Sequence, residues 1–438
     1  MNRHWRSTQL AVVSTIIAVS AGALFAASLP GSEQRIVASD ADTFDWFGRA
    51  VDVSGDFAVV GAPGDDEEAT NAGAAYVFRR QGAIWVETQK LTAEVDAEQF
   101  DEFGFDVAIE RDLIAVGAPG DDDAGNDAGA VYVFEWDGSS WSQIEKFVPD
   151  DLSNAAYEYG TAVDIGIAIP DDGTVELVDV IAGAPNADQS QGVVFLSERN
   201  GGVWTMNQGR FSDSDSTPGI NDNGRFGASV AIRGDNLLGG APDDDQSFNN
   251  SGAAYLFGRT GVTNVWSEVA QYYPDAPTGG ERFGLSVALG DSSVVIGAPA
   301  PSSGAAVGRV YVYSPSLQVF TEGGPTEEYG SSVAIDESMN LLVVGAKRDD
   351  EVAALAGAIF LLERDVLGSW QAGGKVLASD AAINKEFGES VAVQDGTVIV
   401  GGGEIDANSP GAAYVYSSRL FADGFQSGDT SAWSSTSP

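Results

Sequence analysis

Short apolar runs separated by glycine, aspartate and proline recur along the chain and predict β-strands. In the first stretch of this kind, Ala50–Val53 and Phe57–Gly61 flank the polar turn Ser54-Gly55-Asp56, and Ala74–Phe78 and Trp85–Leu91 follow after Gly-rich or polar connections. The runs are brief and rich in β-branched and aromatic residues, which is typical of strands and not of helices. The pattern therefore predicts a unit of four strands in about 57 residues.

This unit recurs seven times, and each copy is marked by an aromatic residue followed by glycine. The marking pairs start 56, 56, 67, 57, 46 and 58 residues apart, which indicates an array of one supersecondary unit. We therefore expect an all-β fold: a seven-bladed β-propeller with four antiparallel strands in each blade. The pairs are Phe47-Gly48, Phe103-Gly104, Tyr159-Gly160, Phe226-Gly227, Phe283-Gly284, Tyr329-Gly330 and Phe387-Gly388.

A second glycine keeps a fixed distance from each marking pair. From the glycine after the aromatic residue to the glycine of a Gly-Ala-Pro element the distance is 13 residues in five repeats, 23 in the third and 15 in the sixth. A one-residue slip would turn the buried face of a strand outward, so we expect insertions only at turns or between blades. The Gly-Ala-Pro glycines are Gly61, Gly117, Gly183, Gly240 and Gly297, and the last two repeats have Gly345 and Gly401 without the proline.

The two ends of the array predict how the ring closes. Gln34-Arg35-Ile36 resembles Gln89-Lys90-Leu91 and Glu145-Lys146-Phe147, which form the last strand of a repeat, whereas the seventh repeat lacks this strand after Tyr414-Val415-Tyr416. An N-terminal strand that completes the C-terminal blade would leave no edge exposed at the seam. We expect one domain at about residues 33–418, followed by a Ser/Thr/Gly-rich tail at 419–438.

The N-terminus and the charge of the chain indicate export. Arg3 and Arg6 precede an apolar run from Leu10 to Phe25 and then small residues, which is typical of a secretory signal peptide at residues 1–28. A membrane anchor is the alternative, but the run is short for a bilayer, so we expect no stable membrane insertion after cleavage and a secreted or cell-surface protein.

The charge balance excludes nucleic acid as a partner. The chain carries 22 basic and 65 acidic residues, a net charge of −43, and loss of Arg3 and Arg6 would make it 20 − 65 = −45. Nucleic-acid binding requires the opposite sign, whereas cations would accumulate around such a surface. There is no cysteine, and the one histidine, His4, lies in the expected signal peptide, which excludes Cys-His and Ser-His-Asp catalysis and the usual zinc sites.

The marking pairs and the Gly-Ala-Pro elements resemble the FG-GAP repeats of integrin alpha-subunit propellers and of many secreted bacterial proteins. The resemblance covers nearly the whole chain after the signal peptide, and it implies a seven-bladed propeller used for adhesion or ligand binding, frequently with calcium in its loops. The integrin-type calcium loop lies between the first two strands of a blade, where this chain mostly has tight Gly-Asp turns. The third repeat alone has room there, with Asp171 and Asp179 at two of the ligand positions.

Acidic loops that follow the Gly-Ala-Pro elements are the other candidate metal ligands. Carboxylate clusters can bind calcium weakly, and the alternative is that these loops are solvated and only keep the protein soluble. No cofactor is required by the sequence, and calcium is left open. The candidate residues in these loops are Asp65, Asp66, Asp121, Asp122, Asp123, Asp243, Asp244, Asp245, Asp349 and Asp350.

These features favour a secreted or cell-surface binding or adhesion module that engages a protein or glycan through one propeller face and is not catalytic. A secreted polysaccharide-acting enzyme, a glycosidase or lyase using carboxylates, is the alternative from another class, and an inert envelope or matrix protein is a third. Arg233-Gly234-Asp235 spells an integrin-binding tripeptide, but it occupies the same hairpin turn as Ser54-Gly55-Asp56, so we expect it to serve turn geometry. The sequence leaves the oligomeric state open.

Overall fold

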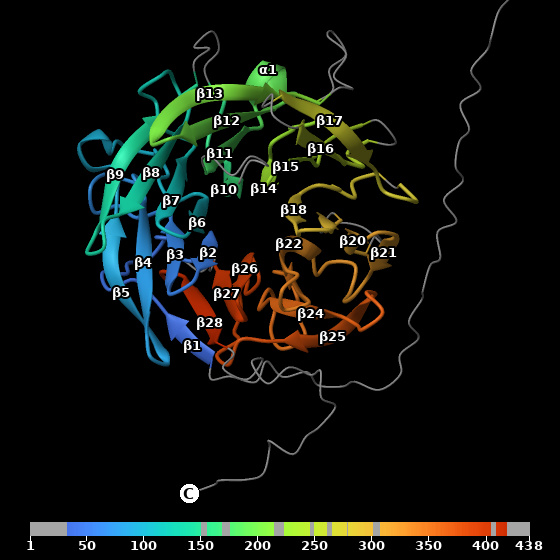
Figure 1. The fold of residues 1–438 in the computed structure, drawn as a ribbon. Helices are drawn as coiled ribbons and strands as arrows, with labels where there is room; N and C mark the ends of the chain where they lie inside the picture. Colours follow the sequence, from blue (N-terminus) through green and yellow to red (C-terminus); the bar gives the residue numbers. More distant parts are fainter. Residues whose placement is uncertain are drawn as a thin grey trace, which may run out of the picture.

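The computed structural model describes residues 33–149, 156–168, 176–213, 223–245, 249–260, 265–277, 279–300, 307–403 and 409–417. These residues form seven four-stranded antiparallel sheets around a central axis (Figure 1). The expected seven-bladed all-β propeller is thereby confirmed. No helix in these ranges is both long and apolar enough to cross a bilayer. The predicted signal peptide and C-terminal tail lie outside the described residues.

Each of the first six blades consists of four consecutive strands, with the first strand nearest the axis and the fourth on the outside (Figure 1). Blade one contains β2 (Val51–Ser54), β3 (Phe57–Ala62), β4 (Ala74–Gln81) and β5 (Ile84–Leu91). Blade two contains β6 (Val107–Glu110), β7 (Leu113–Ala118), β8 (Ala130–Trp136) and β9 (Trp141–Phe147). Blade three contains β10 (Ala162–Ala168), β11 (Leu177–Ala184), β12 (Val193–Asn200) and β13 (Val203–Phe211).

The second half of the ring repeats this order. Blade four contains β14 (Ser229–Arg233), β15 (Asn236–Ala241), β16 (Ala253–Thr260) and β17 (Val265–Tyr272). Blade five contains β18 (Ser286–Leu289), β19 (Val294–Ala298), β20 (Arg309–Tyr313) and β21 (Leu317–Phe320). Blade six contains β22 (Tyr329–Asp336), β23 (Leu341–Ala346), β24 (Ala358–Arg364) and β25 (Trp370–Val376). The short helical segments η1 (Glu94–Asp96) and α1 (Ala187–Ser190) lie between strands.

The seventh blade is completed by the N-terminal strand. It contains β26 (Ser390–Gln394), β27 (Thr397–Gly402), β28 (Ala412–Ser417) and β1 (Glu33–Ile36), and β1 pairs antiparallel with β28. The side-chain amide of Gln34 bonds both the carbonyl and the N–H of Trp85 in blade one, at 2.7 Å each. Gln89 of blade one makes the same pair of bonds to Trp141 of blade two. The first blade boundary is therefore built like the second, as the likeness between Gln34-Arg35-Ile36 and Gln89-Lys90-Leu91 predicts.

The two glycine positions that recur in every repeat meet at the boundary between blades. Within a blade, the N–H of Gly104 donates to the carbonyl of Gly117 at 3.0 Å. Across the boundary, a Cβ built on Gly117 would lie 2.0 Å from the carbonyl oxygen of Gly160 in blade three. The last boundary has the same geometry, because a Cβ on Gly401 would lie 2.0 Å from the oxygen of Gly48. Only glycine permits this close backbone approach, which explains why the glycine persists in repeats that lose the proline.

The core lies between neighbouring blades as a ring of separate apolar clusters. One cluster combines Ala392, Ile399 and Val415 of blade seven with Phe47 and Tyr76 of blade one. The marking aromatic residue packs edge-on against the aromatic residue of the third strand, as in the pair Phe103 and Tyr132 with ring centroids 5.2 Å apart. Aromatic residues thus provide the large buried area between the sheets.

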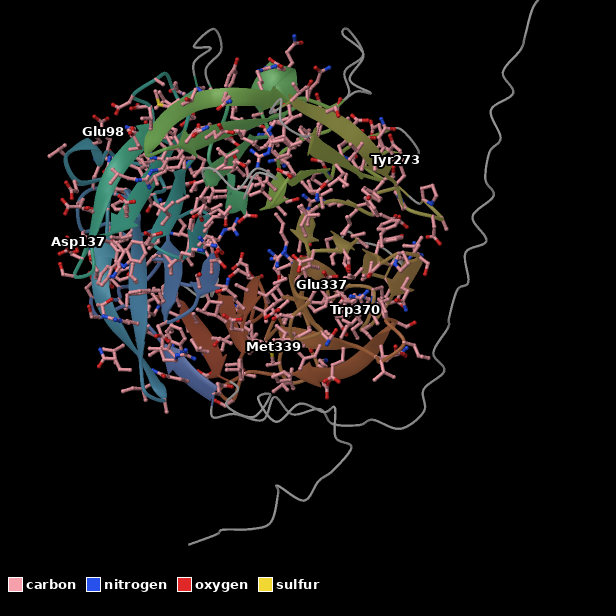
Figure 2. All side chains as sticks on the ribbon, viewed as in Figure 1. Glu98, Asp137, Tyr273, Glu337, Met339 and Trp370 are labelled. Carbon is pink, nitrogen blue, oxygen red and sulfur yellow. The ribbon has the colours of Figure 1, made fainter. Side chains whose placement is uncertain are left out.

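Each blade has an inner hairpin near the axis, between its first and second strands, and each of the first six blades has an outer hairpin at the rim, between its third and fourth strands. Figure 2 shows Glu337, in the inner hairpin between β22 and β23, nearer the centre than Asp137, in the outer hairpin between β8 and β9. Glu337 accepts hydrogen bonds from the backbone N–H and hydroxyl of Ser292 in the preceding blade, at 2.8 and 2.9 Å. The inner hairpins are therefore linked around the ring by polar side chains as well as by packing.

Candidate functional site

One face of the ring carries the connections between second and third strands and the linkers between blades, and we call it the loop face. Both kinds of connection emerge on the same side because the strands of each blade alternate in direction. The acidic loops predicted from the sequence all follow second strands, so they belong to this face. The inner and outer hairpins form the opposite face.

Each acidic loop contains one buried carboxylate, four residues after the Gly-Ala-Pro glycine. Asp65, Asp121, Asp244 and Asp349 are 5%, 2%, 1% and 0% exposed. These four residues are therefore not the solvated loop positions that the charge pattern suggests. Asp66, Asp122, Asp123, Asp245 and Asp350 are exposed, and Asp243 is partly exposed beside Arg225 and Arg282.

A tyrosine of the third strand binds the buried carboxylate in three blades. The hydroxyl groups of Tyr76, Tyr132 and Tyr255 donate to Asp65, Asp121 and Asp244 at 2.6, 2.7 and 2.8 Å. In blade six the corresponding aromatic residue is Phe360, which has no hydroxyl group. Because tyrosine and aspartate lie on adjacent segments of one blade, the bond fixes the start of the loop on the sheet.

A lysine of the fourth strand neutralises this carboxylate in blades one, two and six. Lys90 Nζ lies 2.9 Å from Asp65, 2.8 Å from Asp40 and 2.8 Å from Glu67. Lys146 and Lys375 pair in the same way with Asp121 and Asp349. We call the aspartate, the fourth-strand lysine and, where present, the tyrosine the lysine node.

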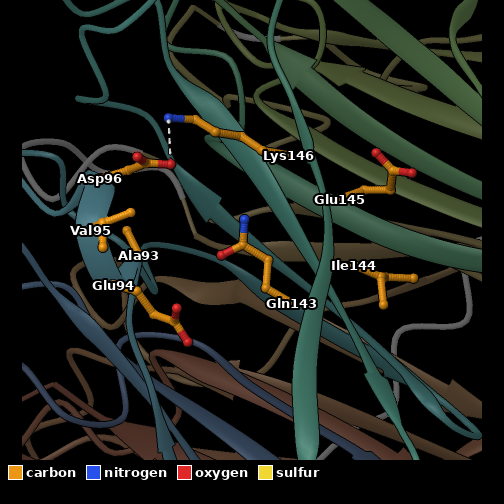
Figure 3. A pocket seen from close by; sticks show the side chains of 8 residues that line it. All are labelled: Ala93, Glu94, Val95, Asp96, Gln143, Ile144, Glu145 and Lys146. Atoms are coloured by element: carbon orange, nitrogen blue, oxygen red, sulfur yellow. Dashed lines mark ion pairs between the residues drawn. The ribbon is translucent and has the colours of Figure 1, made fainter.

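The lysine node of blade two lies beside a cavity of 390 Å³ between β9 and the linker that contains η1. Figure 3 shows Lys146 reaching from β9 towards Asp96 of this linker, with the ion pair drawn as a dashed line at 3.9 Å. Lys146 also lies 2.5 Å from Asp123, so the ammonium group joins the loop, the linker and the strand. The node therefore connects three segments of the loop face.

The lysine ammonium groups contact three of the carboxylates that the sequence offered as metal ligands, Asp65, Asp121 and Asp349. Within the ranges that the structure describes, no group of three or more histidine, cysteine, aspartate or glutamate residues is arranged to hold a metal ion. Calcium binding stays a prediction, and its remaining candidates in blade two are the exposed Asp122 and Asp123. Sequence reasoning found the loops but missed the lysines that pair with them.

Substitutions in the node of blade two are expected to lower stability in a graded way. Lys146→Met leaves Asp121 buried without a counter-charge and is expected to lower the free energy of unfolding by about 3 kcal/mol. Tyr132→Phe removes one hydrogen bond to a carboxylate and is expected to lower it by about 1.5 kcal/mol. Asp123→Asn, at an exposed partner of Lys146, should change it by less than about 1 kcal/mol. Urea unfolding measures all three, and equal losses would contradict the assignment of the buried pair.

A second buried carboxylate lies near the node in blades one and two. Burial raises the pKa of Asp45 and of Asp101 to about 6. The backbone N–H of Asp42 lowers the pKa of Asp45, and that of Glu98 lowers the pKa of Asp101. The nearby charges of Asp65 and Asp121, respectively, raise these pKa values further. Each group is thus easier to protonate in the folded chain than in the unfolded chain. Folding therefore takes up protons between about pH 4 and pH 6.

The pH dependence of stability follows from this sign. Because the folded pKa lies above the unfolded value, the contribution of Asp101 is present below pH 4 and is lost as the pH rises to about 6. Between about pH 4.5 and pH 7, a range set by these pKa values, we expect the melting temperature of Asp101→Asn to fall less than that of the unmutated protein. Asp112→Asn, at an exposed hairpin residue, is the control, and identical pH profiles for the two variants would contradict the assignment.

The third-repeat candidate Asp179 lies in a buried ion cluster. Asp179 and Glu198 of blade three face Arg259 of blade four, whose Nη2 lies 2.9 Å from Asp179 and whose Nη1 lies 3.4 Å from Glu198. Burial raises the pKa of Asp179 to about 7, although Arg259 opposes the shift. The cluster joins two blades, and the other third-repeat candidate, Asp171, lies outside the described residues.

Both charged residues of the Arg-Gly-Asp tripeptide make ion pairs within the ring. Arg233 Nε lies 2.5 Å from Asp291 of blade five, and Asp235 lies 2.7 Å from Arg259 Nε. Gly234 has a φ of 56° in the turn between β14 and β15. The tripeptide therefore has a structural role in the inner hairpins, as its position in the repeat predicts.

Three exposed aromatic residues lie on the loop face in the linkers that precede blades one and two. Phe44, Trp46 and Phe100 are 52%, 37% and 56% exposed, and their φ angles are 73°, 56° and 70°. Positive φ is uncommon for bulky residues and costs about 1 kcal/mol or more. The linker is held by backbone bonds to the neighbouring blade, such as Phe100 N–H to the carbonyl of Thr70 at 2.9 Å. We call Phe44, Trp46 and Phe100 the aromatic patch.

The aromatic patch is the part of the loop face that sequence reasoning missed. Phe44 and Phe100 both lie three residues before a marking aromatic residue, and the equivalent third-repeat residue is Ala156. This departure from the repeat was a usable signal. The acidic segments Asp65-Asp66-Glu67 and Asp121-Asp122-Asp123 belong to the same two blades, so apolar and anionic groups share one sector of the face.

Comparisons with solved structures find distant similarities. The chain is similar to Sqt1 of Saccharomyces cerevisiae, at 11% identity over 83% of this chain and 81% of that chain with a TM-score of 0.42. It is similar to the Dos1 propeller, at 12% identity over 82% and 75% with a TM-score of 0.46. It is similar to the acylaminoacyl peptidase of Pyrococcus horikoshii, at 9% identity over 84% and 50% with a TM-score of 0.42.

The family match is more informative than these distant structures. No curated protein matches the chain in sequence. The FG-GAP repeat family matches residues 30–78, 85–134, 208–257, 266–313 and 370–416, which together make up more than half of the chain. The glycine contacts between blades account for the glycines of these repeats. The chain belongs to the FG-GAP repeat family.

Proposed function

We propose that this protein is a non-catalytic binding module, secreted or attached to the cell surface, that engages a protein or glycan through its loop face. The FG-GAP fold is consistent with this role but does not by itself specify it. The observation that carries the proposal is the aromatic patch, which is exposed and held by backbone hydrogen bonds.

The composition of the patch suits recognition. Aromatic side chains supply a large contact area with few rotatable bonds, and they are enriched at protein interfaces. The carboxylates of the two neighbouring acidic loops add negative charge around them. Such a surface favours a ligand that offers apolar faces together with hydroxyl or positively charged groups.

The binding proposal is tested on glycan and peptide arrays with matched variants. The triple variant Phe44→Ala, Trp46→Ala and Phe100→Ala removes the patch. The control is Val366→Ala with Leu367→Ala, because these residues are exposed in the outer hairpin between β24 and β25 on the opposite face. We expect the unmutated protein and the control to bind the same ligands, and the triple variant to bind them at least about tenfold more weakly. Equal binding by the triple variant would contradict the proposal, as would the absence of any bound ligand.

Export is part of the same proposal. Residues 1–28 have the composition of a signal peptide, and the chain carries no cysteine that an oxidising compartment would cross-link. We expect the protein outside the cytoplasm, with a new N-terminus near Ser28. N-terminal sequencing of the extracellular or surface fraction tests this, and an intact Met1 terminus in the cytoplasmic fraction would contradict it.

Calcium is expected to act on the exposed loop carboxylates if it binds. A weak site, with a dissociation constant around 10⁻⁴–10⁻³ M, would stabilise the fold by about 1.4 kcal/mol at ten times that concentration. Thermal unfolding with and without calcium measures the effect. Asp122→Asn with Asp123→Asn should reduce the response, whereas Asp121→Asn should lower stability equally in both conditions. No change in the unmutated protein would remove calcium from the account.

A further inference from the structure

The central channel opens on the loop face into a cavity of 380 Å³. Its wall is built by the starts of the innermost strands of all seven blades, which surround the axis in Figure 1. This volume lies in the range of small-molecule sites, roughly 300–1,000 Å³. The cavity does not include Phe44, Trp46 or Phe100, so it is a feature separate from the aromatic patch.

Three cationic side chains from different parts of the ring line this cavity. Arg49 and Lys347 share the carboxylate of Glu389 at 3.7 and 3.6 Å, and Arg225 lies 3.7 Å from Asp243. These separations exceed hydrogen-bond length, so the ion pairs leave hydrogen-bond donors of the three cations available. Among the described residues, Arg225 Nε has no hydrogen-bond partner.

The positions of these groups are supported by the surrounding structure. The guanidinium group of Arg49 lies over the ring of Phe105 in blade two, 4.6 Å from its centroid. Ser331, at the start of blade six, also lines the cavity, and its hydroxyl oxygen is buried without a hydrogen-bond partner in the described structure. A ligand oxygen could satisfy the donors that the protein leaves unpaired, and buried polar groups normally have such a partner.

The charge of the lining differs from that of the whole chain. The cavity is lined by three cations, Arg49, Arg225 and Lys347, and by two carboxylates, Asp106 and Glu389, so the formal charges of the lining sum to 3 − 2 = +1, with Asp243 beside Arg225 outside the lining. The chain carries −43. One negative charge on a ligand would balance this lining.

Part of the cavity wall is apolar. Val230, Val287 and Val333, from three neighbouring inner strands, line it together with serine residues. Two of these serines already donate to glycine carbonyls of the next blade: Ser286 to Gly330 and Ser332 to Gly388, at 2.9 Å each. The lining therefore combines cations with an apolar wall. This arrangement fits an organic anion better than an inorganic one.

We propose that the central cavity binds a small organic monocarboxylate, with its carboxylate at Arg49 and Lys347, its carbon body against the valine wall, and Arg225 of blade four as a further hydrogen-bond donor. This assigns a small-molecule site in addition to the proposed docking face. Hydrogen bonds from arginine or lysine to an ionised carboxylate are stronger than hydrogen bonds between neutral groups. The ring of Phe105 holds the guanidinium group of Arg49 in place by a cation–π contact.

The site is tested with benzoate and glucuronate, which carry one carboxylate on an apolar and on a polar ring. Their methyl esters are uncharged controls, and inorganic phosphate is the control for a more highly charged anion. We expect at least one of the two acids to bind in isothermal titration calorimetry and to raise the melting temperature. The methyl ester of that acid should bind at least about tenfold more weakly, because it cannot form the charge-assisted hydrogen bonds with the cations. Phosphate should also bind at least about tenfold more weakly, because it has no carbon body to contact the valine wall. No binding of either acid, or equal binding of acid and ester, would overturn the proposal.

Variants locate the binding. Arg49→Gln with Lys347→Gln should weaken the acid at least about tenfold, whereas the triple variant of the aromatic patch should leave it unchanged. Arg225→Gln provides a second cavity variant in case the double variant unfolds, and circular dichroism checks that each variant is folded. Unchanged affinity in a folded cavity variant would overturn the proposal. Loss of affinity in the patch variant would also overturn it as a separate site, whatever the outcome of the array experiment.

Discussion

Replacing Ile36 by aspartate is expected to abolish cooperative folding of the ring. Ile36 is buried in the cluster between blades seven and one, and it pairs with Ala413 in the register of β1 on β28. An aspartate there would bury a charge without a partner or detach the strand and expose the edge of β28. Either result should lower the free energy of unfolding by more than about 4 kcal/mol.

The neighbouring residue provides the control for Ile36→Asp. Arg35 lies on the same strand, but its side chain is partly exposed and pairs with Asp380 at 3.3 Å, so Arg35→Gln should cost less than about 1 kcal/mol. Urea unfolding followed by circular dichroism measures both variants. If Ile36→Asp unfolds at the same urea concentration as the unmutated protein, the N-terminal strand does not hold the ring closed.

Replacing Gly117 by alanine is also expected to destabilise the ring strongly. The added methyl group would lie 2.0 Å from the carbonyl oxygen of Gly160, so blades two and three would have to separate. Overpacking of this kind, against backbone that cannot rotate away, should lower the free energy of unfolding by about 3 kcal/mol. Gly117 is not among the glycines with positive φ, so the effect would come from packing alone.

A glycine without close neighbours separates packing from backbone strain. Gly82 has a φ of 69° in the hairpin between β4 and β5, and a Cβ there would meet nothing within 4 Å. Gly82→Ala should therefore cost only about 1 kcal/mol, from its backbone conformation. Equal losses at the two positions would contradict the assigned role of the glycine contact between blades.

The fold could be predicted because each repeat carries its own local signals. The marking pairs, the fixed 13-residue spacing and the short apolar runs determine four strands per unit without reference to other repeats. Even the closure was predictable, since Gln34-Arg35-Ile36 matches Gln89-Lys90-Leu91. In the structure both glutamines bond the backbone of a tryptophan in the next blade. Strand ends differ by only a few residues from the expected runs, for example Ala74–Gln81 against Ala74–Phe78.

The candidate site was harder to predict because its partners lie far apart in the sequence. Lys90 and Lys146 follow Asp65 and Asp121 by the same 25 residues, so the lysine nodes left a detectable pattern. In the seventh repeat Ile405 stands at the aspartate position. Reading the repeats against each other for paired changes would have found the nodes, whereas reading the acidic loops alone suggested only solvation or calcium.

The buried ion cluster between blades three and four carried a weaker signal. Asp179 and Arg259 are 80 residues apart. Arginine also occupies the position of Arg259 in three other repeats, as Arg80, Arg199 and Arg364, but no other repeat has a carboxylate at the position of Asp179. The exposure of Phe44, Trp46 and Phe100 likewise depends on how the linkers cross the loop face, which the apolar pattern alone does not specify. These features depend on the assembled ring and not on the individual repeat.

The most direct test of the closed ring is a disulfide across its seam. The chain has no cysteine, and Glu33 lies opposite Tyr416 in the register of β1 and β28. Directly opposed residues of antiparallel strands have Cα atoms about 4.5–5.5 Å apart, within the range that a disulfide spans. We expect Glu33→Cys with Tyr416→Cys to cross-link under mild oxidation, and Glu33→Cys with Val415→Cys, on opposite faces of the sheet, to stay reduced. Failure of the first pair to cross-link, or equal cross-linking of both pairs, would contradict the closed ring.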